Sequence, residues 1–158
     1  HAMTGSRIGW VCGPEPVIER LIDLATITTY GVPGFIQEAA LFALQQGPDL
    51  EARIAAPFRR RRDLALRVLS QSSARHGLRA VPAQGAMYVM LDVRATGLSG
   101  EVFADRLLDD RRIAVMPGES FGQAAAGHVR VALTVPDDSL EKALHDICAF
   151  AQQTAHAA

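Results

Sequence analysis

Apolar residues recur along this chain with two different periods, which predict a mixture of helices and strands. Helical spacing predicts helices over residues 17–28, 35–45, 50–71, 98–109 and 140–153. Short apolar or alternating runs predict strands over residues 8–12, 78–81, 87–93, 113–116 and 128–135. In the last of these strands Val129, Val131 and Leu133 share one face and Arg130 lies on the other, which is typical of a half-buried strand.

Composition narrows the class of protein. The chain has 49% hydrophobic and 21% charged residues and a formal net charge of -1, so nothing predicts disorder, a membrane span or a nucleic-acid partner. Cys12 and Cys148 lie far apart in apolar contexts without the spacing of metal ligands, so we expect neither a disulfide framework nor a bound metal. Free cysteines are typical of a reducing compartment, which favours the cytoplasm.

The arginine run over residues 59–62 is a candidate basic patch. Consecutive helical residues point about 100° apart, so this run does not form the single stripe that binds nucleic acid. We expect a solvated helix face with ion pairs.

The chain also contains a single lysine, Lys142, at a polar position of the last predicted helix. It follows the stretch Asp138-Ser139-Leu140-Glu141, which has the form of a capping box. We expect Lys142 to be solvated and therefore no Schiff-base lysine among these residues.

A turn of small residues near the start of the chain presents one arginine. In Ala2-Met3-Thr4-Gly5-Ser6-Arg7-Ile8-Gly9-Trp10, Gly5 allows close backbone approach, and the planar guanidinium of Arg7 suits a phosphate ester. An arginine that caps a surface turn is the alternative. The stretch resembles the pyridoxal-phosphate (PLP) lysine segment of class I/II aminotransferases. The resemblance implies that Arg7 binds the cofactor phosphate and that the Schiff-base lysine lies two residues before His1, in a longer polypeptide.

A second motif of the same family lies in the C-terminal half. The loop Pro117-Gly118-Glu119-Ser120-Phe121-Gly122 is followed by the strand start Gly127-His128-Val129-Arg130. The family has a Pro-Gly-x-x-Phe-Gly turn and then a strand arginine that binds the α-carboxylate of the substrate, so the resemblance implies this role for Arg130. A surface arginine in an ion pair is the alternative. Two motifs in the order of the family favour substrate binding.

The break between the first two predicted helices, Thr29-Tyr30-Gly31-Val32-Pro33-Gly34, is rich in turn residues. In the family the equivalent break reaches across a dimer interface toward the active site of the partner. The resemblance therefore implies a homodimer in which Tyr30 and Gly31 make this contact, and a simple loop between helices is the alternative. Ile27 stands where aspartate-type aminotransferases place an arginine for the distal carboxylate, which argues against an obligate dicarboxylate substrate.

The resemblance covers essentially the whole chain and implies an α/β fold, that of a fold-type I PLP-dependent transferase. Residues 1–58 would be the end of the PLP-binding large domain and residues 59–158 the small C-terminal α+β domain, with the boundary inside the helix predicted over residues 50–71. The implied reaction is a ping-pong transfer of an amino group from an amino acid to a 2-oxo acid such as pyruvate. Segments such as Thr96-Gly97-Leu98-Ser99 look most like bacterial arginine–pyruvate aminotransferases, which makes arginine a candidate donor.

Two other classes of protein are compatible with these family motifs. Another PLP enzyme of the same fold, such as a β-lyase or a decarboxylase, would need the same cofactor clamp. An aminotransferase-like effector domain of a transcription regulator would bind PLP without turnover. Sequence upstream of His1 would separate these interpretations, because a complete large domain favours the enzyme and a winged helix with a basic linker favours the regulator.

Overall fold

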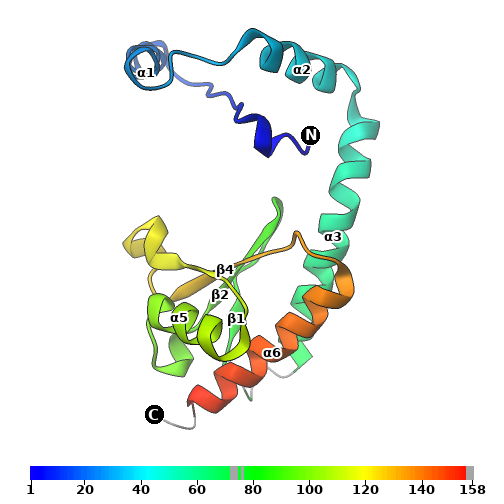
Figure 1. The fold of residues 1–158 in the computed structure, drawn as a ribbon, viewed down its shortest axis with the longest axis vertical. Helices are drawn as coiled ribbons and strands as arrows, with labels where there is room; N and C mark the ends of the chain where they lie inside the picture. The colour runs from blue at the N-terminus through cyan, green and yellow to red at the C-terminus, as the bar shows by residue number, and fades with distance from the viewer. Residues whose placement is uncertain (72–74, 76, 156–158) are drawn as a thin grey trace. The chain divides into compact units, whose positions relative to one another are not determined.

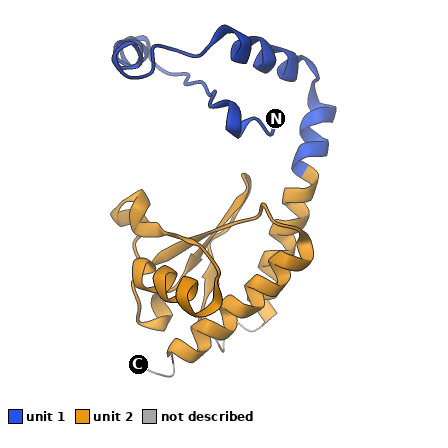
Figure 2. Cartoon of the chain, in the orientation of Figure 1, with its two compact units in different colours: residues 1–55 blue, residues 56–158 orange. Residues whose placement is uncertain are grey.

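The computed structural model describes residues 1–71, 75 and 77–155. The chain divides into two compact units, residues 1–55 and residues 56–158, shown in blue and orange in Figure 2. The boundary falls within helix α3 (Pro48–Gln71), which is continuous through Pro57 as far as Gln71. No loop or turn therefore separates the two units.

The first unit is helical. A 3-10 turn over Thr4–Ser6 precedes α1 (Glu15–Thr28) and α2 (Gly34–Gln45), and both helices lie where the apolar spacing predicts them. A proline stands at the start of α1, where a helix residue has no intrahelical use for its N–H. All 55 residues of this unit are described, and none of them is buried. The apolar side chains of α1 and α2 therefore have no closed core within this unit.

The buried strand predicted over residues 8–12 does not form. These residues have no regular structure, and the side chains of Trp10 and Val11 are 70% and 65% exposed. A strand needs a neighbour that accepts and donates its backbone hydrogen bonds. None of the described residues pairs with residues 8–12, so the apolar run alone gave a wrong prediction for this chain.

The second unit contains a four-stranded antiparallel sheet in the order β1-β2-β4-β3. Its strands are β1 (Arg79–Ala80), β2 (Tyr88–Asp92), β4 (His128–Ala132) and β3 (Met116–Pro117). β1, β2 and β4 lie within their predicted ranges but are shorter, whereas β3 overlaps the range 113–116 only at Met116. Ile113 and Val115 still pack against the core, so burial rather than strand pairing explains that apolar run.

Helices α5 (Gly100–Arg111), α6 (Asp137–Ala155) and the second half of α3 cover one face of this sheet (Figure 1). In and after β4, Val129, Val131 and Leu133 are buried, whereas Arg130 is half-buried on the opposite face, as the alternation predicts. The large side chains of the core come from all these elements: Leu64, Val68, Leu69, Leu78, Val89, Leu91, Val93, Phe103, Leu107, Val129, Val131, Leu133, Leu140, Leu144, Ile147 and Phe150.

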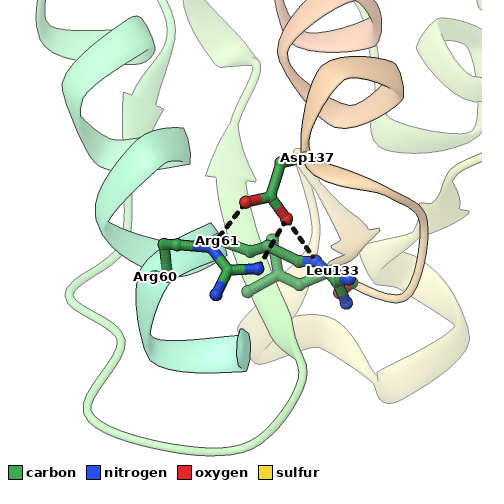
Figure 3. Close-up of polar contacts among 4 residues, drawn as sticks. All are labelled: Arg60, Arg61, Leu133 and Asp137. Carbon is green, nitrogen blue, oxygen red and sulfur yellow. Dashed lines mark hydrogen bonds and ion pairs between the residues drawn. The ribbon is translucent and has the colours of Figure 1, made fainter. Parts of the chain in front are cut away.

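The first residue of α6, Asp137, links that helix to α3. Arg61 Nε donates to Asp137 Oδ1 at 2.9 Å, and Arg60 donates to both carboxylate oxygens of Asp137 (Figure 3). Arg61 Nη1 also donates to the carbonyl of Leu133 at 3.1 Å. The hydrogen bonds from Arg60 and then Arg61 lower the pKa of Asp137 to about 2. The expected ion pairs of the arginine run are confirmed, and α6 begins one residue before the predicted capping box.

We expect Asp137→Asn to lower the melting temperature modestly at neutral pH, because exposed ion pairs contribute little to stability. Asp137 has its folded pKa below its ordinary value of 3.8, so its contribution is present above pH 3.8 and is lost as the pH falls through about 2. The difference between variant and parent should therefore shrink over that interval in thermal melts. Asp138→Asn is the control, because Asp138 lies in the same first turn of α6 but forms no ion pair with a described residue. Equal effects of the two variants would contradict a role for the pair.

Candidate functional site

Arg130 occupies the middle of β4, opposite Met90 of β2 and Met116 of β3. Its side chain is half-buried on the face of the sheet that the helices leave open. It makes no ion pair or hydrogen bond with any residue that the structure describes. The half-buried Arg61 and Arg62 are instead paired with aspartates. The alternative interpretation of Arg130, a surface arginine in an ion pair, therefore finds no ion pair among the described residues.

Two aromatic rings hold the guanidinium of Arg130. Its Cζ lies 4.1 Å from the ring centroid of Tyr88 and 4.8 Å from that of Phe121. A cation over an aromatic face is attracted by the ring quadrupole, and the attraction uses none of the N–H donors. The donors and the positive charge of Arg130 therefore stay available to an anion.

The loop that carries Phe121 is fixed by a carboxylate. Glu119 Oε1 accepts the backbone N–H of Gly100, at the start of α5, at 2.9 Å and that of Gly127, before β4, at 3.0 Å. The N–H of Gly127, followed by those of Glu119 itself and Gly100, lowers the pKa of Glu119. One oxygen thus joins the loop, α5 and β4. The sequence showed the motif around Glu119 but not this role, because its partners lie 19 and 8 residues away.

The glycine of the Pro-Gly turn has a packing role. A Cβ atom on Gly118 would overlap the carbonyl oxygen of Ala125 and would lie 2.9 Å from the carbonyl oxygen of His128. Both obstacles are backbone atoms, which do not move aside as the end of a flexible side chain can. The loop therefore packs against the start of β4 at a distance that only glycine allows.

Arg7 follows the 3-10 turn of the first unit, with a left-handed backbone at φ 53°. Its Nη1 donates to the carbonyl of Thr4 at 3.0 Å, and no described acidic residue pairs with it. The side chain is exposed, and the space beside Gly5 is open. An oriented guanidinium with most of its donors unused fits the phosphate of PLP. Arg7 belongs to the first unit and Arg130 to the second.

The break between α1 and α2 contains the two residues predicted to contact a partner subunit. Tyr30 and Gly31 both have left-handed backbones, at φ 55° and 94°, and the side chain of Tyr30 is 90% exposed.

Lys142 is exposed on α6, as expected for a solvated helix residue. Within the described part of the chain no cluster of His, Cys, Asp or Glu could hold a metal ion. None of the described helices is long and apolar enough to span a membrane.

Comparison with known proteins places the chain in a family. A family model for class I and II aminotransferases matches residues 1–147. The chain is 47% identical over 154 residues to an arginine–pyruvate transaminase of Pseudomonas aeruginosa, which covers 97% of this chain and 38% of that protein. It is 40% identical over 146 residues to a probable aspartate/prephenate aminotransferase of Thermus aquaticus, covering 90% of this chain and 36% of that protein.

Solved structures agree with the sequence comparison. The aromatic aminotransferase of Pyrococcus horikoshii matches with a TM-score of 0.76 at 32% identity, over 96% of this chain and 40% of that one. An aspartate aminotransferase of Thermus thermophilus, solved with maleate, matches with a TM-score of 0.74 at 36% identity, over 94% and 38%. The chain therefore spans between 36% and 40% of the length of these proteins.

Proposed function

We propose that this chain, which belongs to the class I and II aminotransferase family, is part of a PLP-dependent enzyme that transfers an amino group from an amino acid to a 2-oxo acid. Its fold is that of the C-terminal part of a fold-type I aminotransferase. The observation that carries this proposal is the state of Arg130. Its guanidinium is half-buried and held by two rings, and no described acid neutralises it.

In this proposal Arg130 binds the carboxylate that is shared by every amino donor and every 2-oxo acid. A planar guanidinium can donate two parallel hydrogen bonds to the two oxygens of a carboxylate. Such a contact fixes the orientation of the substrate as well as its position. The Cα of the substrate is then presented in one geometry to the group that moves its proton, which is how a binding residue lowers a chemical barrier.

The cofactor in this proposal is PLP, and Arg7 supplies one contact for its phosphate. When bound, PLP withdraws electrons from the Cα of the substrate. As the resemblance to the family implies, we place the Schiff-base lysine two residues before His1. Lys142, the only lysine of the chain, is exposed on α6 and is not a candidate for this role. The residues of this chain therefore bind and orient, and the proton at Cα is moved by a lysine outside it.

For the substrates we propose arginine as donor and pyruvate as acceptor. The 47% identity to the arginine–pyruvate transaminase of Pseudomonas aeruginosa supports this choice. Ile27 supports it indirectly, because an aliphatic side chain does not bind the distal carboxylate of a dicarboxylic acid.

We also propose a cytoplasmic homodimer in which Tyr30 and Gly31 contact the partner's active site. The proposed domain boundary, between residues 58 and 59, lies in the same helix as the boundary between the compact units.

The test is a product assay on the complete protein, loaded with PLP and supplied with arginine and pyruvate. Amino transfer gives alanine and the 2-oxo acid of arginine in equal amounts. A decarboxylase would release carbon dioxide from arginine, and a β-lyase would release ammonia and pyruvate from a donor with a leaving group on Cβ. PLP binding without any product would favour the effector domain. Aspartate in place of arginine tests the interpretation of Ile27, and we expect it to be a poor donor.

We expect Arg7→Ala to weaken PLP retention about tenfold in the complete protein. The substitution removes charge-assisted hydrogen bonds, each worth about 1.5–3 kcal/mol, and the exposure of Arg7 reduces that value. Cofactor loss during dialysis, followed by absorbance, measures the effect. Arg20→Ala is the matched control, because Arg20 is an exposed arginine of the same unit that pairs with Asp23. PLP retention equal to that of the control would mean that Arg7 only caps a surface turn.

A further inference from the structure

A substrate-binding arginine has two requirements that conflict. Its side chain must be held in one orientation before the substrate arrives, yet its hydrogen-bond donors and its charge must stay unused. Arg61 shows the usual way to hold an arginine, with Asp137 and the carbonyl of Leu133 as acceptors, and that way uses the donors. Arg130 is held with no polar partner among the described residues, so a different device must orient it.

We propose that Tyr88 and Phe121 form an aromatic clamp that positions Arg130 for its carboxylate ligand. This inference rests on the proposed function only in taking a carboxylate as the ligand of Arg130. The clamp is defined as the two rings whose centroids lie 4.1 Å and 4.8 Å from the guanidinium carbon. Neither ring consumes an N–H donor, and neither carries a negative charge that would compete with a substrate.

The two rings come from opposite sides of the strand that carries Arg130. Tyr88 belongs to β2, which pairs with one edge of β4, and it lies two residues along β2 from Met90, the partner of Arg130. Phe121 ends the turn that follows β3, which pairs with the other edge of β4. Since β4 lies between β2 and β3, the clamp needs both neighbours in register.

The loop that carries Phe121 is held by close packing at Gly118 and by the carboxylate of Glu119. Gly118 packs against the Ala125 carbonyl, and Glu119 binds the N–H groups of Gly100 and Gly127. The loop is thus tied to the start of β4 three residues before Arg130. This arrangement makes the position of Phe121 depend on the same strand that it helps to organise. Tyr88 and Phe121 are therefore positioning residues rather than catalytic ones.

The test uses the complete protein loaded with PLP and compares Tyr88→Leu, Phe121→Leu and Tyr88→Phe with the parent. Leucine keeps apolar volume but removes the ring, and phenylalanine keeps the ring. The probe is propanoate, a carboxylate without an amino group, whose dissociation constant is measured by ligand-observed NMR. KM and kcat for amino transfer are measured beside it. The matched control is Phe58→Leu. The ring centroid of Phe58 lies 5.9 Å from Cζ of Arg61, an arginine that already forms an ion pair with Asp137.

We expect each leucine variant to bind propanoate about three- to thirtyfold more weakly, the range that one cation–π contact supplies. KM should rise by a similar factor for donor and acceptor, with a smaller change in kcat. Tyr88→Phe and Phe58→Leu should bind as the parent does. Parent-like binding by both leucine variants would overturn the clamp, as would the same loss in Phe58→Leu or a failure of the parent to bind propanoate. A parent that binds propanoate but transfers no amino group would refute the proposed function and leave the clamp standing.

Discussion

Replacing Arg130 by lysine should lower kcat/KM about ten- to a hundredfold for arginine, alanine and pyruvate alike, while PLP stays bound. Lysine keeps the charge but lacks the planar fork, so one bidentate, charge-assisted contact worth about 1.5–3 kcal/mol is lost. All three proposed substrates carry the same carboxylate, so the loss should be indifferent to their side chains. Poor orientation of Cα should also appear in the single-turnover rate of both half-reactions.

The matched control for this substitution is Arg79→Lys. Arg79 is an exposed strand arginine of the same sheet, on β1, and its side chain forms no ion pair with any described residue. Its replacement should leave all three rates unchanged. A variant of Arg130 that is slowed for one substrate only would show that Arg130 reads a side chain. A variant that is not slowed at all would make Arg130 a surface residue and would remove the main support of the proposed function.

The second large effect concerns packing. Gly118→Ala should destabilise the second unit by about 3 kcal/mol, because the added Cβ has no space between the carbonyl groups of Ala125 and His128. Any relief of this overlap moves the loop, and Phe121 moves with it, so carboxylate affinity should fall as well. Thermal melts of the complete protein and the propanoate dissociation constant measure the two effects separately.

Gly85→Ala provides the comparison for Gly118→Ala. Gly85 lies in the connection between β1 and β2, where a Cβ atom would meet nothing within 4 Å. Its replacement removes the same conformational freedom from the unfolded chain without any overlap in the folded one. We expect no loss of stability there. Equal melting temperatures for the two variants would mean that the loop adjusts at no cost, and the close packing at Gly118 would then be unimportant.

The periodic parts of the fold could be predicted from the sequence. A helix or a strand that covers a core repeats its apolar residues with the period of its own backbone, so α1, α2, α3, α5 and α6 and the alternation around Arg130 were visible. The two family motifs were visible for a related reason. The sequence displays the Pro-Gly turn that contains Gly118, but the close approach of Gly118 to the carbonyl oxygens of Ala125 and His128 is seen only in the structure.

Other features depend on contacts that no local pattern records. The run of residues 8–12 has the composition of a strand, but pairing is a property of a neighbour, and none of the described residues supplies it. Glu119 binds backbone N–H groups, which every residue except proline carries, so its partners leave no signature. Tyr88 reaches Arg130 only through the register of β2 with β4, and Phe121 only through the pairing of β3 with β4. The roles of Arg7, Arg130, Tyr30 and Gly31 stay predictions.

The course of α3 affects how the chain would respond to proteases. Enzymes that cut native proteins act on exposed, flexible segments, and the boundary between the two units lies within a hydrogen-bonded helix. Digestion should therefore not separate the units between Ala55 and Ala56 unless α3 first unwinds there. Unwinding near Pro57 should cost less than elsewhere in the helix interior, because Pro57 has no N–H to give to the carbonyl of Arg53. We therefore expect proteolytic cleavage between the units to start with unwinding of α3 near Pro57.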